Sequence, residues 1–379
     1  MKDAGRAVRT VSLGLSIGLQ TLLSHGIEVD AAKSPSTSGT ATHSESETRS
    51  MRGLAVLRPR GRLSASELGL VINIADPYSV QVGEFYAQAR GLEAAQVLRV
   101  VLPVRREMHE ADFQSLVAQI AARFGGDIQA LALAWNQPYV VGCQSITGAL
   151  ALGLDNGLCE RSCAPTEASP YFNSASLRPW SELRMRPSML LAAADVRGAR
   201  ALIERGVAAD GSLGWRGAPP VHARFVVTRD AARSVRSRLY PPPVFLRRFG
   251  VDVSVETDDA AENPDRVLLY LTGLAQVSDL DRLDFVPGAL ADHMTSFGGQ
   301  LDGSSTQTSA RAWLDAGATA SYGTVSEPCN HLQKFPHPQV LLRHYLEGST
   351  ALEAYWKSVA WPSQGVFIGE PLAAPFARP

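Results

Sequence analysis

Three side chains in the last third of the chain are of types that catalyse acyl transfer: His293, Ser296 and Cys329. An imidazole serves as a general base, and a hydroxyl or thiol that gives up its proton becomes a nucleophile. His293 and Ser296 lie in ALADHMTSFGG, and Cys329 follows the apolar run ATASYGTV in SEPCNH. The sequence therefore predicts His293 as the base and Ser296 or Cys329 as the nucleophile of a catalytic site.

Neighbouring residues predict a binding role for the same segment. A carboxylate such as Asp292 can fix the tautomer of an imidazole, but on a strand Asp292 and His293 point to opposite faces and pair only on a turn. Thr295, Gly298 and Gly299 can expose backbone N–H groups that suit an anion. The simpler alternatives are a polar corner at a strand end and an ordinary loop.

The four cysteines, at positions 143, 159, 163 and 329, are candidates for disulfides because an even count is typical of exported proteins. Three pairings are open. Cys159 and Cys163 are close enough to bridge locally, which leaves Cys143 with Cys329. A bridge would remove Cys329 as a nucleophile. In a reducing compartment Cys159 and Cys163 would form half of a zinc site, but the second half is missing, so we expect no metal and no cofactor.

The N-terminus resembles an export signal. Within residues 1–32, two arginines precede the apolar run 11–23, and residues 33–62 form a Ser/Thr-rich polar linker that cannot bury a core. These features predict an exported protein, periplasmic or extracellular. The alternative is that translation begins at Met51 and that the protein is cytoplasmic.

Composition limits the partners. The chain has 379 residues, 45% of them hydrophobic, which is enough for a large core. Its net charge of −1 gives no electrostatic reason to expect nucleic acid. No apolar run after the first segment is long enough to span a bilayer, so we expect no transmembrane helix beyond the signal segment. The sequence identifies no partner.

Strands and helices alternate along the chain. LGLVINI (68–74), followed by Asp76, is a strand and turn, and the next two predicted strands are QVLRVVLP and IQALALAW. Asp76 would line a cleft at the carboxyl edge of the sheet or simply form a turn with Pro77. Later apolar runs are SMLLAAA, ARFVVTR, VDVSVET and RVLLYLTGL. This order predicts an α/β fold with a mostly parallel sheet flanked by helices.

We expect an α/β domain over residues 63–379. Residues 136–187 lack periodicity, hold three of the cysteines and read as an irregular insertion, while residues 266–376 carry the C-terminal motifs. Four helices are predicted between strands: one with Ser79 as N-cap and Gly91 at its end, one over 111–124, one ending at Gly206, and one starting near Asp230.

Several motifs resemble one uncharacterised family of predicted exported bacterial proteins. They include LGLVINIADPYSVQVGEFYAQARGL, ALAWNQPYVVGCQSIT, ADHMTSFGG, ARAWLDAGATASYGTVSEPCN and YWKSVAWPSQGVFIGEPLAAPF. The resemblance covers the chain from about Leu63 to Phe376 and implies no activity.

The C-terminal block is also similar to the caspase-like fold, a three-layer sandwich that includes gingipain-type peptidases. In that fold a His-Gly pair follows one strand and a Cys follows the next. Here Thr272 and Gly273 follow RVLLYL, and Thr295 and Ser296 follow the next strand. The resemblance therefore implies either a hydrolase that works by another geometry or a relative that has lost the chemistry. The competing prediction is a non-catalytic binding or cell-surface-associated module.

Overall fold

A computed structural model describes residues 61–257 and 265–378. The predicted signal segment, most of the predicted linker and the alternative start at Met51 lie outside the described residues.

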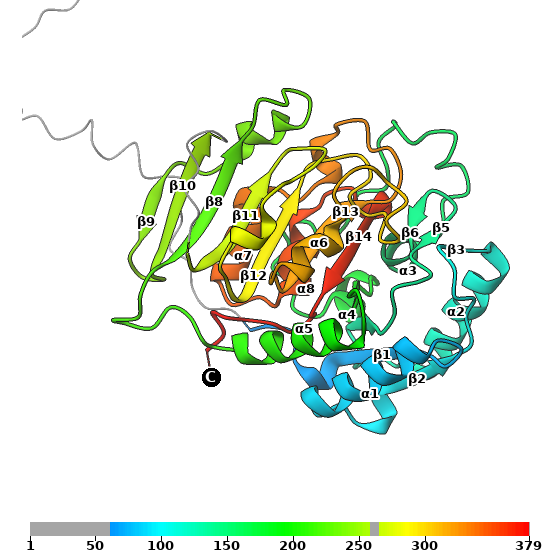
Figure 1. Cartoon of the computed structure of the whole chain (residues 1–379). Coiled ribbons are helices and arrows are strands. Elements are labelled where there is room, and N and C mark those ends of the chain that lie inside the picture. Colours follow the sequence, from blue (N-terminus) through cyan, green and yellow to red (C-terminus); the bar gives the residue numbers. More distant parts are fainter. Residues whose placement is uncertain (1–60, 258–264, 379) are drawn as a thin grey trace, which may run out of the picture. The chain divides into compact units, whose positions relative to one another are not determined.

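Within these residues, eleven strands form one sheet in the order β2-β1-β4-β7-β14-β13-β12-β11-β8-β10-β9 (Figure 1). A second sheet has the order β3-β5-β6. The strands are β1 Leu68–Asn73, β2 Val97–Val100, β3 Glu107–Met108, β4 Ala130–Leu133, β5 Val140–Val141, β6 Gln144–Ser145, β7 Ser188–Leu190, β8 Val221–Val227, β9 Val244–Leu246, β10 Val251–Thr257, β11 Val267–Thr272, β12 Phe285–His293, β13 Ala320–Thr324 and β14 Gly365–Gly369.

Most neighbouring strands of the large sheet are parallel. β1 pairs in parallel with β2 and β4, and β11 pairs in parallel with β8 and β12. β14 is antiparallel to β13, and the edge strand β9 is antiparallel to β10. The predicted α/β class with a mostly parallel sheet is confirmed.

Helices cover both faces of the sheet. Successive residues of β1 alternate between two hydrophobic cores: Leu70 and Ile72 belong to the core that includes residues of α1, α5, α7 and α8, and Val71 belongs to the core that includes residues of α2, α3 and α6. The architecture is thus the three-layer sandwich that was expected. The α-helices are α1 Pro77–Arg90, α2 Glu110–Arg123, α3 Ile146–Leu152, α4 Pro179–Leu183, α5 Val196–Ala209, α6 Ala310–Asp315, α7 Pro338–Leu346 and α8 Ala351–Ser358. The 3₁₀ turns are η1 Ala65–Glu67, η2 Ala94–Gln96, η3 Ser234–Leu239, η4 Leu280–Arg282, η5 Leu332–Lys334 and η6 Pro362–Gln364.

Helix α1 begins earlier than the sequence suggested. Its N-cap is Asp76, whose side chain accepts a hydrogen bond from the Tyr78 N–H at 3.0 Å. Ser79 instead accepts from the Asn73 N–H and joins the helix to β1. The predicted end is correct, because Gly91 adopts the left-handed conformation of a C-cap.

Two other helix predictions were wrong. Helix α5 continues past Gly206 to Ala209. Gly206 is a close-packing position within the helix rather than its end, since a Cβ there would meet the buried side chain of Glu370. The segment after Asp230 forms the 3₁₀ turn η3 rather than an α-helix. Asp230 accepts from the Arg233 N–H, which closes a turn where the helix would start.

Candidate functional site

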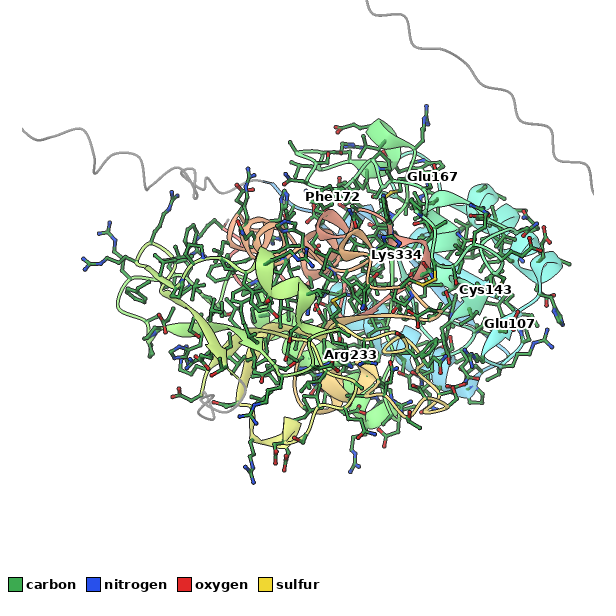
Figure 2. The ribbon with its side chains drawn as sticks, turned by 90° about the horizontal axis from the view of Figure 1, so that it is seen from above. Glu107, Cys143, Glu167, Phe172, Arg233 and Lys334 are labelled. Carbon is green, nitrogen blue, oxygen red and sulfur yellow. A yellow bond between two sulfur atoms is a disulfide. The ribbon has the colours of Figure 1, made fainter. Side chains whose placement is uncertain are left out.

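Four strands that carry the predicted site, β8, β11, β12 and β13, end at one edge of the large sheet (Figure 1). The loops after them carry Arg233, Ser296 and Lys334. Cys143, in the turn after β5, contacts the same region: its carbonyl accepts a hydrogen bond from the Ser326 hydroxyl at 2.7 Å. Figure 2 views Arg233, Cys143 and Lys334 from above. This carboxyl edge is where ligands bind in open α/β sheets.

Asp292 serves as the partner of a buried arginine. It lies on β12 and its carboxylate accepts from Arg236 of η3 at 2.5 Å, with both side chains 1% exposed. Arg236 also donates to the Thr272 carbonyl at the end of β11. Burial raises the pKa of the Asp292 carboxyl, and the Arg236 guanidinium opposes that rise. Asp292 therefore joins η3 to the strand ends and does not orient an imidazole.

His293 points to the opposite face, as expected for consecutive strand residues. The indole N–H of Trp313 in α6 donates to its Nδ1 at 2.9 Å. Nε2 is buried and has no hydrogen-bond partner among the described residues. Burial, together with the nearby charge of Arg236, lowers the pKa of His293 to about 3. The imidazole is therefore neutral near pH 7, and its acceptor nitrogen, Nδ1, already takes the hydrogen bond from Trp313.

Ser296 lies half-buried just beyond the end of β12. Its hydroxyl has no hydrogen-bond partner among the described residues, and its carbonyl accepts from Thr324. Next to it, the Thr295 hydroxyl donates to Gln307 at 2.7 Å and accepts from Nε of Arg233 at 3.1 Å. The partly exposed edge is thus polar and holds a fixed guanidinium beside a serine.

Gly299 in the loop after β12 and Gly323 in β13 are needed for packing. A Cβ at Gly299 would lie 2.5 Å from the carbonyl oxygen of Gly323 in β13, and a Cβ at Gly323 would clash with the Gly298 backbone. Neither loop glycine adopts a positive φ. The motif lets the loop after β12 lie directly on β13.

Cys329 is bonded to Cys163, and Cys143 is bonded to Cys159. Of the three pairings that the sequence left open, the one with a local bridge between Cys159 and Cys163 is not formed. The loop after β13 approaches the insertion at Cys163, and His331 and Lys334 of this loop bond the carbonyls of Cys163 and Ser162. The sulfur of Cys329 is therefore not a free nucleophile in the oxidised protein, and neither Cys159 nor Cys163 is a zinc ligand.

Sequence reasoning missed the arginines after β8. The segment TRDAARSVRSR holds four arginines and one aspartate between positions 229 and 238. Arg236 is neutralised inside the protein by Asp292, and Arg233 donates to Asp230 at 2.8 Å. The density of arginines at a strand end was the signal that could have revealed this basic edge.

Two cavities lie among the described loops. The larger, about 540 Å³, lies between α5 and the end of α6 and is lined by Arg197, Arg205 and Asp315 beside small residues. The smaller, about 240 Å³, is lined mainly by apolar side chains that include Phe172 and Phe335. None of the predicted site residues lines either cavity.

The described residues contain no group of three or more His, Cys, Asp or Glu side chains that could hold a metal ion. No helix among them has the length and apolar character needed to cross a membrane.

Comparisons with known proteins returned one solved structure and no family. No family model matches the chain, and no curated protein matches it. The crystal structure of the Arg-specific cysteine proteinase gingipain R is similar at 11% sequence identity with a TM-score of 0.47, over 82% of this chain and 78% of that chain.

Proposed function

We propose that this protein is a non-catalytic binding module whose carboxyl edge holds a carboxylate-bearing ligand. One observation carries the proposal: the predicted base His293, the predicted thiol Cys329 and the neighbouring carboxylate Asp292 each have a structural partner. His293 accepts from Trp313, Asp292 pairs with Arg236, and Cys329 is bonded to Cys163. Ser296 keeps an available hydroxyl, but His293, its nearest candidate base in the sequence, is neutral and bonded elsewhere.

The ligand class follows from the guanidinium of Arg233. Its side chain is partly exposed, and Asp230 and Thr295 hold it in place. A planar guanidinium in a fixed orientation suits a carboxylate, and the Ser296 hydroxyl can donate to the same anion.

A fluorescent hexaglutamate peptide is a direct probe of this edge. We expect saturable binding that weakens as salt rises. Arg233→Gln should weaken it roughly tenfold, which corresponds to about 1.4 kcal/mol. The matched control is Arg105→Gln, because Arg105 is exposed and lies 3.9 Å from its acidic partner, Asp112. An equal loss of affinity in both variants, or no loss of affinity in Arg233→Gln, would show that the peptide does not bind this edge.

Export belongs to the same proposal. The two disulfides require an oxidising compartment to form and persist. With the signal-like residues 1–32, they support a periplasmic or extracellular module and membership of the exported family that the motifs resemble. Mass spectrometry of the protein expressed with its N-terminus would detect cleavage near Ala31, and an intact N-terminus in the cytoplasm would contradict export.

A further inference from the structure

The smaller cavity has the properties of a preformed site for one aromatic ring. It is walled by apolar side chains from four separate segments, and its volume is about 240 Å³. A cavity of roughly 150 Å³ lined by apolar side chains holds one benzene molecule, so this cavity has room for a single substituted ring. Its apolar walls are Phe172, Leu239, Leu332, Phe335 and Ala360.

The walls are fixed to one another by hydrogen bonds. On either side of Phe172, the Ser169 N–H donates to Ala360 and the Asn173 N–H donates to Lys357, both at 2.8 Å. Opposite, the His337 N–H donates to the Ser358 carbonyl at 2.8 Å. A ligand would therefore enter an ordered pocket, and the entropic cost of ordering the walls on binding would be small.

The Cys163–Cys329 disulfide ties together two of the segments that line the cavity. Phe172 belongs to the insertion that contains Cys163, and Leu332 follows Cys329 by three residues. Lys334 reinforces this link by donating to the Ser162 carbonyl at 2.5 Å.

The polar part of the lining is uncharged. It includes the imidazole of His337, and burial lowers the pKa of that group. The cavity therefore favours a neutral ligand with one hydrogen-bonding group over an ionic one.

We propose that this cavity binds a small neutral aromatic molecule with a single ring system and one polar group, of the phenol or indole type, and that the Cys163–Cys329 disulfide maintains its affinity. Neither Arg233 nor Ser296 lines this cavity, and its occupant does not depend on the function proposed above.

Calorimetric titration of the oxidised, full-length protein with phenol and with indole tests the assignment. We expect saturable binding of at least one of them at one site per chain. Ala360→Phe places a ring in the cavity and should weaken binding at least tenfold. Ala316→Phe, at the end of α6, adds the same ring outside the cavity and should bind as the wild type does. Leu332→Phe serves as a second filling variant if Ala360→Phe does not fold.

The double variant Cys163→Ala/Cys329→Ala should fold but bind at least threefold more weakly. Absence of saturation with both compounds would overturn the proposal, as would unchanged affinity in a folded filling variant. Binding of N-acetylphenylalaninamide without binding of phenol or indole would also overturn it, since the occupant would then be a peptide side chain.

Discussion

Replacing His293 with glutamine should change how stability depends on pH. In the folded protein the pKa of His293 is about 3, against 6.5 for an ordinary histidine. Below pH 6.5 the unfolded chain binds a proton at this position and the folded protein does not, so stability falls as the pH falls. At 1.36 kcal/mol per pH unit, the full loss down to pH 3 is about 5 kcal/mol.

Between pH 7.5 and pH 5.0 the same reasoning gives a loss of about 2 kcal/mol from this residue. The physical cause is that protonation of Nδ1 breaks the hydrogen bond from Trp313 and puts a charge in a site that is 1% exposed. Urea unfolding of the wild type and of His293→Gln at both pH values measures this loss of stability. The variant does not titrate there, so the wild type should lose about 2 kcal/mol more on acidification.

His109→Gln is the control, because His109 is exposed at the start of α2. On acidification, His109→Gln should lose as much free energy of unfolding as the wild type does. Equal pH dependence of the wild type and His293→Gln would refute the buried, neutral imidazole, and with it the reason for excluding His293 as a base.

Three further predictions concern the framework of the site. Arg236→Met should lower the free energy of unfolding, measured by urea titration, by about 3–5 kcal/mol, because Asp292 is left as an unpaired buried charge. The double variant with Asp292→Leu should recover part of that loss. A loss below about 1 kcal/mol in Arg236→Met would contradict the buried pair. Peptide mapping without reduction should recover Cys163 joined to Cys329, and a different pairing would contradict the structure. This bridge closes a separation of 166 residues, so removing it should lower the free energy of unfolding by up to about 5 kcal/mol. Gly323→Ala should lower the stability measured by thermal unfolding by about 1–3 kcal/mol, because the added methyl group clashes with the loop after β12. An unchanged Tm would show that the loop can move away.

Strands such as LGLVINI and IQALALAW were predictable because burial on both faces gives continuous apolar runs. The meeting of the loops after β8, β11, β12 and β13 at one edge was also predictable, since the carboxyl ends of parallel strands lie together. Asp292 and His293 on opposite faces follow directly from strand geometry.

Other features depend on contacts that local sequence does not contain. The partner of His293 is Trp313, 20 residues away on α6, and that of Asp292 is Arg236, 56 residues away. The disulfide pairing depends on how the insertion folds back onto the loop after β13, which spacing cannot reveal. Gly206 lies within α5 and does not end it; the reason for a glycine there is Glu370, far along the chain, which occupies the space of a Cβ.

Labelling of the native, oxidised protein with a fluorophosphonate tests the central claim most directly. Intact-mass analysis between pH 6 and pH 9 reports any covalent adduct, and peptide mapping locates it. We expect no adduct on Ser296, because no base in the described structure activates its hydroxyl. A stoichiometric adduct on Ser296 that disappears in His293→Gln would show that the two residues form a catalytic pair and that the protein is a hydrolase.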